Sequence, residues 1–233
     1  YFISQEQRDP LAAVEMLRRL AFNGIEIGQL EEAVSVEGIS HSKGSWVIPM
    51  DQPNANFVRQ LFSVQEYPDL REYPEGPPEQ PYDVSGWTLP YQFDVRVVEL
   101  TTPLNEEVRS KIVKLEDDPL SWDDQVDAQT WDSPPGVGFD SHPVARAVVP
   151  LERVIAGSGP ALYLSPSENN SYRAVSRAWK EGADVRFLPA SKIAVGPESG
   201  QWLINGLSIS SQANLVDDFS LRARRGATSG LSI

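Results

Sequence analysis

The sequence predicts an α/β fold: a layered, mostly parallel sheet with flanking helices, built from two similar duplicated βαβ-type modules. Strand-like, helical and again strand-like segments follow one another near the N-terminus, and the same order recurs near the C-terminus. A motif of Gly, any residue, Trp and then apolar residues starts at Gly44 and again at Gly200. Strand-helix-strand order is typical of parallel sheets, because parallel neighbours need a crossover connection.

The first module begins with YFIS at residues 1–4, whose aromatic and β-branched side chains indicate a buried strand. Asp9 and Pro10 provide an N-cap and a first-turn proline for the helix that follows. Apolar residues at helical spacing continue it: Leu11, Val14, Leu17 and Leu20. Residues 25–27 (IEI) and the segment after Gly44 are predicted to be the next two strands.

The second module repeats this order with different residues. LYLS at 162–165 matches YFIS, and a predicted helix at 169–182 carries Tyr172, Val175 and Trp179 on one side. The offset between matching features is about 156 to 161 residues, which a few loop insertions explain, so we interpret the pattern as an internal duplication of about 60 residues. Chance similarity between two ordinary βαβ segments is the alternative.

These patterns divide the chain into four parts. Residues 1–100 contain the first module and a Pro-rich aromatic connection, residues 101–160 form an acidic connecting region, residues 161–220 contain the second module, and residues 221–233 form a tail or linker.

Composition excludes several classes of function. The net charge of −13 opposes binding to nucleic acid or to anionic membranes, and no apolar run is long enough to span a bilayer. The absence of cysteine excludes disulfides, thiolate metal sites and a cysteine nucleophile. We therefore expect neither a nucleic acid partner nor a membrane partner.

No complete catalytic motif is present, and we predict that this chain is not an enzyme and holds no metal or cofactor. Its two histidines, His41 and His142, lie in separate loops without the spacing of a zinc hydrolase. Neither a nucleophile elbow nor a phosphate-binding glycine motif occurs in its expected context. The acidic segment at 116–143 has two interpretations, a calcium site or a solvated acidic face, and its spacing is not that of a helix-loop-helix calcium site.

Open α/β sheets bind ligands where strands end and helices begin. This rule makes the residues after the first strand of each module the candidate ligand-binding residues: Glu6, Arg8, Glu168, Asn169 and Asn170. Helix capping and solvated charge are the alternative interpretation. Tyr73, Tyr82 and Trp87 in the aromatic connection are candidates for an interdomain contact, with packing of the connection or a sugar or peptide platform as alternatives.

Three strings carry a family resemblance: GSWVIPMDQP at 44–53, YPDLREYPEGPP at 67–78 and PYDVSGWTLP at 81–90. They resemble the region downstream of the catalytic domain in bacterial zinc carboxypeptidase-like proteins of the carboxypeptidase A class. In that family this accessory region is described as glutamine-amidotransferase-like in fold, and the missing cysteine implies a catalytically silent version.

The resemblance implies a non-catalytic accessory domain that packs on a peptidase domain of the same polypeptide or presents substrate to it. That peptidase domain and peptide substrate are then the expected partners, and zinc is expected only in the peptidase domain, which this chain does not contain. The resemblance also implies a periplasmic or extracellular location. A stand-alone peptide- or glycan-binding module with a pocket at the strand ends is the alternative.

Overall fold

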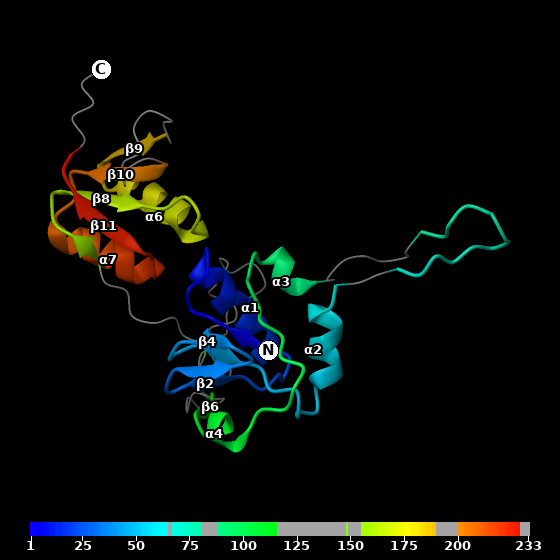
Figure 1. Ribbon diagram of the computed structural model, residues 1–233. Coiled ribbons are helices and arrows are strands. Elements are labelled where there is room, and N and C mark those ends of the chain that lie inside the picture. The colour runs from blue at the N-terminus through cyan, green and yellow to red at the C-terminus, as the bar shows by residue number, and fades with distance from the viewer. Residues whose placement is uncertain (65–66, 81–87, 116–147, 149–154, 190–199, 229–233) are drawn as a thin grey trace, which may run out of the picture. The chain divides into compact units, whose positions relative to one another are not determined.

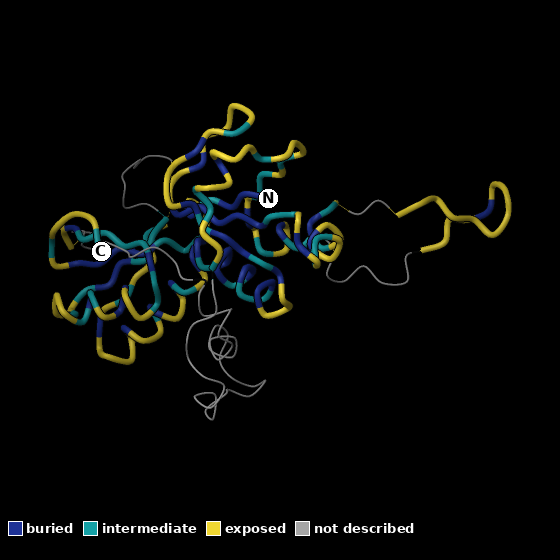
Figure 2. The backbone as a smooth tube through the Cα atoms, turned by 90° about the horizontal axis from the view of Figure 1, so that it is seen from below, coloured by how far each residue is buried: buried dark blue, intermediate teal, exposed yellow. Residues whose placement is uncertain are grey.

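The computed structural model describes residues 1–64, 67–80, 88–115, 148, 155–189 and 200–228, and the chain forms two compact units (Figure 1). The first unit comprises Tyr1–Gln7 and Ala13–Val149, and the second comprises Arg8–Ala12 and Pro150–Ile233. Figure 2 shows buried backbone within each unit and exposed loops around it.

The first unit contains a four-stranded sheet in the order β1-β5-β2-β6, and all neighbouring strands run antiparallel. An isolated antiparallel bridge between Phe2 and Val98 extends the β1 edge. A separate hairpin pairs β3 with β4. The bounds of the strands are β1 Phe2–Ile3, β2 Gly28–Leu30, β3 Val34–Val36, β4 Ile39–His41, β5 Trp46–Val47 and β6 Ile112–Lys114.

Four described helices belong to this part of the chain: α1 (Pro10–Phe22), α2 (Ala55–Phe62), α3 (Leu89–Gln92) and α4 (Glu106–Arg109). The predicted apolar spacing of α1 matches deep burial, because the side chains of Val14, Leu17 and Leu20 are at most 2% exposed. At α4 the side chain of Asn105 accepts a hydrogen bond from the Val108 N–H at 2.9 Å and caps the helix.

The second unit contains a five-stranded sheet in the order β7-β11-β8-β10-β9. Only the pair β11 and β7 is parallel among these strands, and the other neighbours are antiparallel. Two helices, α6 (Asn169–Lys180) and α7 (Ile209–Phe219), follow β8 and β10 in the chain. The strands are β7 Ala156–Gly157, β8 Ala161–Leu164, β9 Asp184–Leu188, β10 Gln201–Asn205 and β11 Ala223–Gly226.

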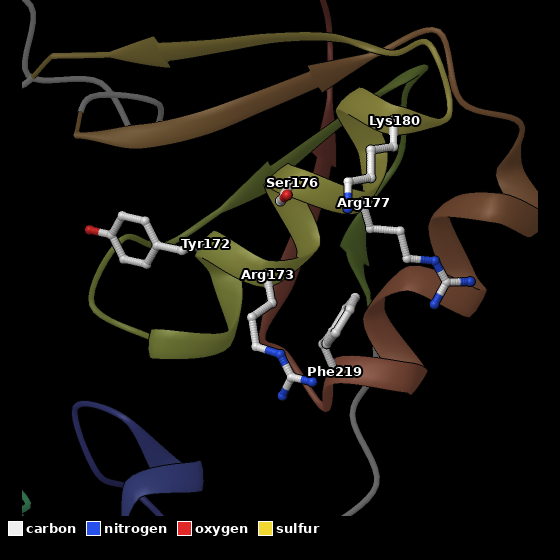
Figure 3. A pocket seen from close by; sticks show the side chains of 6 residues that line it. All are labelled: Tyr172, Arg173, Ser176, Arg177, Lys180 and Phe219. Carbon is white, nitrogen blue, oxygen red and sulfur yellow. The ribbon is translucent and has the colours of Figure 1, made fainter. Parts of the chain in front are cut away.

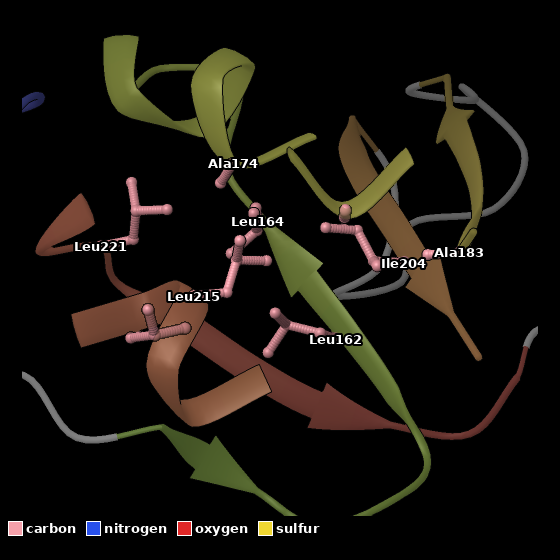
Figure 4. Close-up of a cluster of buried hydrophobic side chains, with 9 residues drawn as sticks. Leu162, Leu164, Ala174, Ala183, Ile204, Leu215 and Leu221 are labelled. Carbon is pink, nitrogen blue, oxygen red and sulfur yellow. The ribbon is translucent and has the colours of Figure 1, made fainter. Parts of the chain in front are cut away.

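The core of the second unit lies between its sheet and its two helices (Figure 4). Alternate residues of β8, Leu162 and Leu164, contribute to it, while Ala161 and Tyr163 belong to a second cluster with Leu203. Burial of one such leucine side chain stabilises a fold by about 1.5–3 kcal/mol. The helices add small and branched residues to the core: Ala174, Ala178, Leu215 and Val216.

The predicted mostly parallel sheet is wrong. In each unit a helix joins two strands that run parallel, β1 to β2 and β8 to β9, but these strands are not neighbours. β5 lies between the first pair and β10 between the second, and each is antiparallel to both flanking strands. Helical periodicity indicates that a helix connects two strands, but it does not determine which other strand lies between those two strands in the sheet.

The two units share the register of this inserted strand. Ile3 pairs with Trp46 in the first unit, and Leu164 pairs with Trp202 in the second. The glycine two residues before each Trp has a positive φ, 84° at Gly44 and 70° at Gly200. The N–H of Gly44 donates to the Leu30 carbonyl at 2.8 Å, and that of Gly200 donates to the Leu188 carbonyl at 2.6 Å. The repeated motif therefore encodes the entry of the chain into the inserted strand, β5 or β10.

Two segments outside the predicted modules join the sheets. β6, which lies in the predicted connecting region, pairs with β2, and β11, which lies in the predicted tail, pairs with β8. Residues 67–80 form a hairpin-like arm with an antiparallel bridge between Arg71 and Pro78, exposed along nearly its whole length. The acidic segment at 116–143 and its calcium alternative lie outside the described residues.

Glycine at position 200 is expected to be required by its backbone conformation. A side chain in the left-handed region costs about 1–2 kcal/mol, so Gly200→Ala should lower the free energy of unfolding by about that amount. Asn tolerates this region better than Ala does, so Gly200→Asn should lose less. Urea unfolding of both variants tests this expectation, and equal stability of Gly200→Ala and the unchanged protein would contradict it.

His41 is a buried histidine whose surroundings disfavour its charged form. Its side chain is 5% exposed, and its ring lies against Phe2 with 4.4 Å between the ring centroids. Its Nε2 atom is buried without a hydrogen-bond partner in the described part of the chain. Burial therefore lowers the pKa of His41 below the ordinary value of 6.5.

A lowered histidine pKa makes the fold less stable in acid. The unfolded chain binds a proton as the pH falls through about 6.5, whereas the folded chain resists it, so stability is full above this pH and declines below it. The free energy of unfolding measured by urea between pH 7.5 and 5.5 should fall more steeply for the unchanged protein than for His41→Phe. Parallel curves for the two proteins would show that His41 does not contribute.

Candidate functional site

The predicted ligand-binding residues are found in several environments. Glu6 is exposed and belongs to the first unit, where its carbonyl accepts a hydrogen bond from Arg96 Nη2 at 2.8 Å. Arg8 is exposed and belongs to the second unit, where its carbonyl accepts from Arg222 Nη2 at 2.5 Å. Their assignment to a ligand site stays a prediction.

Glu168 is the most buried of the predicted site residues, at 1% exposed, and it occupies the N-cap position of α6. Its Oε1 accepts from Arg222 Nε at 2.5 Å, and its Oε2 accepts from the Arg222 backbone N–H at 3.1 Å. The carboxylate thus fixes the start of α6 to the chain immediately before β11. Both oxygens have protein partners.

Asn169 and Asn170 form the first turn of α6. The Asn169 N–H donates to Asp9 Oδ2 at 2.9 Å. Asn170 Nδ2 donates to the Phe219 carbonyl at 3.1 Å, which links the start of α6 to the end of α7. The Asn170 Oδ1 accepts from Arg173 Nη1 at 3.3 Å. These are the contacts expected of residues that hold helix ends together.

The predicted interdomain contact is described only in part. Tyr73 lies in the exposed arm at 67–80, and its side chain is largely exposed. Tyr82 and Trp87 lie outside the described residues.

The outward side of α6 carries the strongest candidate site in the described chain. Its inward residues are small, Ser171, Ala174 and Ala178, and all three are buried. Large side chains therefore point outward. We call the outward residues of α6, together with Phe219 at the end of α7, the α6 surface: Tyr172, Arg173, Ser176, Arg177, Trp179, Lys180 and Phe219.

A depression of about 530 Å³ lies within this surface (Figure 3). Phe219, the last residue of α7, lines it, and the guanidinium carbons of Arg173 and Arg177 lie 5.2 and 5.9 Å from the centroid of the Phe219 ring. Cations over an aromatic face are held by the ring quadrupole. The remaining lining residues are Tyr172, Ser176 and Lys180.

The cations of the α6 surface differ in their electrostatic surroundings. Arg177 donates to Asp218 Oδ2 at 2.5 Å and to Glu181 Oε1 at 3.1 Å, and the hydrogen bond that Asp218 accepts raises the pKa of Arg177. Arg173 and Lys180 form no ion pair with a carboxylate among the described residues. Among the described residues, two cations of the α6 surface are therefore without a carboxylate partner, in a chain whose net charge is −13.

The aromatic residues of the α6 surface differ in their contacts with the sheet and in their exposure. Tyr172 contacts Trp202 of β10 edge to face, with 5.9 Å between the ring centroids, and Phe187 of β9 contacts the same Trp202 at 5.0 Å. Trp179 is 74% exposed, and Tyr172 is 52% exposed. The cations and the aromatic rings lie on adjacent stripes of one helix, which suits the binding of a ligand that is both anionic and apolar.

Within the described residues, no group of three or more His, Asp or Glu side chains is arranged to hold a metal ion. None of the described helices is long and apolar enough to cross a membrane. No protein-family model, curated protein or solved structure matches the chain.

Glu168 is expected to contribute to stability through its hydrogen bonds. Glu168→Gln leaves Arg222 without its carboxylate partner, and loss of a buried ion pair of this kind costs about 2–3 kcal/mol, toward the lower end because the Arg222 side chain is 37% exposed. Urea unfolding measures the loss. Glu181→Gln is a matched control, because Glu181 is exposed at the other end of α6 and should matter little. Equal effects of the two substitutions would contradict the expectation.

Proposed function

We propose that this chain is a non-catalytic accessory region of a zinc metallocarboxypeptidase-like protein, which packs on the peptidase domain or presents substrate to it. The observation that carries the proposal is the exposure of Trp179 and Tyr172 beside the cations of the α6 surface. Tryptophan, tyrosine and arginine are the residues that contribute most often to binding energy at protein interfaces. A surface built from them is suited to contact with a protein or peptide.

The sequence motifs support the connection to a peptidase. Residues 44–53 and 67–78 resemble the region downstream of the catalytic domain in the carboxypeptidase A class. The second motif lies in the exposed arm, where Tyr67, Leu70 and Tyr73 are all exposed. Exposed apolar side chains on such an arm are typical of a contact element. The same resemblance supports a periplasmic or extracellular location.

The chemistry of the α6 surface favours recognition over catalysis. It offers cations, aromatic rings and the hydroxyl of Ser176. Neither α6 nor α7 carries a histidine that could act as a base, and the nearby carboxylates of Glu181 and Asp218 are paired with Arg177. Zinc is expected only in the peptidase domain.

The alternative is a peptide- or glycan-binding module that acts without a peptidase domain. The 530 Å³ depression favours this alternative over a purely packing role, because it is concave and combines apolar and charged lining residues. The two proposals share the α6 surface and differ in whether a peptidase domain is covalently attached.

Peptidase assays distinguish the accessory role from an enzyme. This chain with added zinc should not hydrolyse peptides with varied C-terminal residues, whereas the full-length polypeptide that contains it should, because the ligands for zinc are expected upstream. Release of C-terminal amino acids is measured by mass spectrometry. Hydrolysis by this chain alone would overturn the proposal, and absence of hydrolysis by the full-length polypeptide would favour the stand-alone module.

A further inference from the structure

We infer that the α6 surface binds an acidic peptide segment that carries a large apolar side chain. This inference rests on the proposed function, because it specifies the chemistry of the partner for the same surface.

The helices α1 and α6 occupy equivalent positions in their units and end in the same way. Each is followed by a glycine with positive φ, Gly24 at 77° and Gly182 at 87°. The next N–H donates back into the helix: Ile25 to the Leu20 carbonyl at 3.1 Å, and Ala183 to the Ala178 carbonyl at 3.0 Å. Counting back from these glycines aligns the two helices residue by residue.

This alignment places Trp179 opposite Ala21, and Tyr172 opposite Val14. Ala21 and Val14 are each 1% exposed, whereas Trp179 is 74% exposed and Tyr172 is 52% exposed. The same side of the helix is therefore covered in the first unit and open in the second.

Later parts of the first unit contact two arginines of α1, Arg18 and Arg19. The ring of Phe93 lies 5.7 Å from the guanidinium carbon of Arg19, and the carbonyl of Val148 accepts a hydrogen bond from Arg18 Nε at 3.0 Å. The segment around Phe93 thus contacts α1 through an aromatic ring over Arg19, and Val148 contacts it through a backbone carbonyl that accepts from Arg18. The same alignment places Arg19 opposite Arg177, which already lies near the ring of Phe219. The positions left open for a bound segment are therefore those of Tyr172 and Trp179.

The charge of the surface selects an acidic segment. Arg173 and Lys180 have no carboxylate partner in the described chain, and α6 itself contains no acidic residue. Carboxylates near these cations form charge-assisted hydrogen bonds, which are stronger than neutral ones.

The spacing on the helix limits the length of the segment. Arg173 and Lys180 are seven residues apart, which corresponds to about 10 Å along the helix axis. Three residues of extended or polyproline II chain cover about the same distance. Trp179 and Tyr172 are also seven residues apart and lie on the adjacent stripe. A segment with two acidic residues three positions apart and an apolar side chain between them fits both stripes.

Fluorescence anisotropy with a labelled peptide tests the inference. The probe is a fluorescein-labelled dodecapeptide with two central Glu residues three positions apart and a Trp between them. A matched peptide has Gln in place of both Glu, and another has Ala in place of Trp. With the unchanged chain, we expect each replacement to weaken binding at least tenfold, and added salt to weaken only the binding that depends on Glu.

Protein variants locate the site. The double substitution Arg173→Glu and Lys180→Glu, and separately Trp179→Ala, should each weaken binding of the Glu peptide at least tenfold. Arg186→Glu on β9 is a matched control, because it reverses an exposed charge in the same unit and should leave binding within twofold. The positions are all on the surface, and circular dichroism confirms that each variant is folded.

Several results would overturn the inference. Equal binding of the Glu and Gln peptides does so without any protein variant. Tighter binding to single-stranded oligonucleotides, to vesicles of phosphatidylcholine and phosphatidylglycerol, or to neutral oligosaccharides would assign the surface to another partner. The peptidase assays report separately on the proposed function: hydrolysis by this chain overturns the accessory role even if the acidic peptide binds, and failure of the peptide to bind leaves that role standing.

Discussion

The pairing of one inserted strand with both of its neighbours is the interaction on which each unit depends. β5 pairs antiparallel with both β1 and β2, and β10 pairs antiparallel with both β8 and β9. Trp46 and Trp202 lie at matching positions of the register. β1 and β2 are only two and three residues long, so neither could form a stable sheet without this shared partner. The positive φ at Gly44 and Gly200 sets the direction in which the inserted strand enters.

The packing of the second unit explains why its α6 surface is open. Ser171, Ala174 and Ala178 face the core, and small residues allow the helix to lie close to the elements beneath it. Tyr172 and Trp179 are thereby left outward, and only Tyr172 gains a ring contact to the sheet. The same packing brings α6 beside the end of α7, where Phe219 supports two arginines. The aromatic and cationic side chains of the α6 surface are thus exposed because small residues of the same helix occupy the core side.

The sequence predicted the helices α1 and α6 and the strands β1 and β8 that precede them, but it missed the hairpin β3-β4 and β11, placed the strand after α1 at 25–27 instead of Gly28–Leu30, and predicted the wrong sheet pairing. Helical spacing in α1 and the turn glycines Gly24 and Gly182 are local signals, and the structure places helices where they indicate them. Sheet order depends on contacts between distant segments, which a local pattern does not contain, so the parallel prediction failed. For the candidate site, Tyr172, Val175 and Trp179 were grouped on one side, but large size at helical spacing does not determine which side faces inward. The periodic cations Arg173, Arg177 and Lys180 were the signal for the outward side.

The contrast between α1 and α6 has a consequence for how the chain can change over evolutionary time. Val14 and Ala21 of α1 are enclosed, so a substitution at either position must still fill the space that the original side chain occupies. The equivalent positions of α6 carry no such demand, and their side chains can vary at little expense to folding. Packing therefore restricts the residue types that these positions of the first unit can hold. In the second unit the equivalent positions can change and alter what the surface binds, while the fold stays intact.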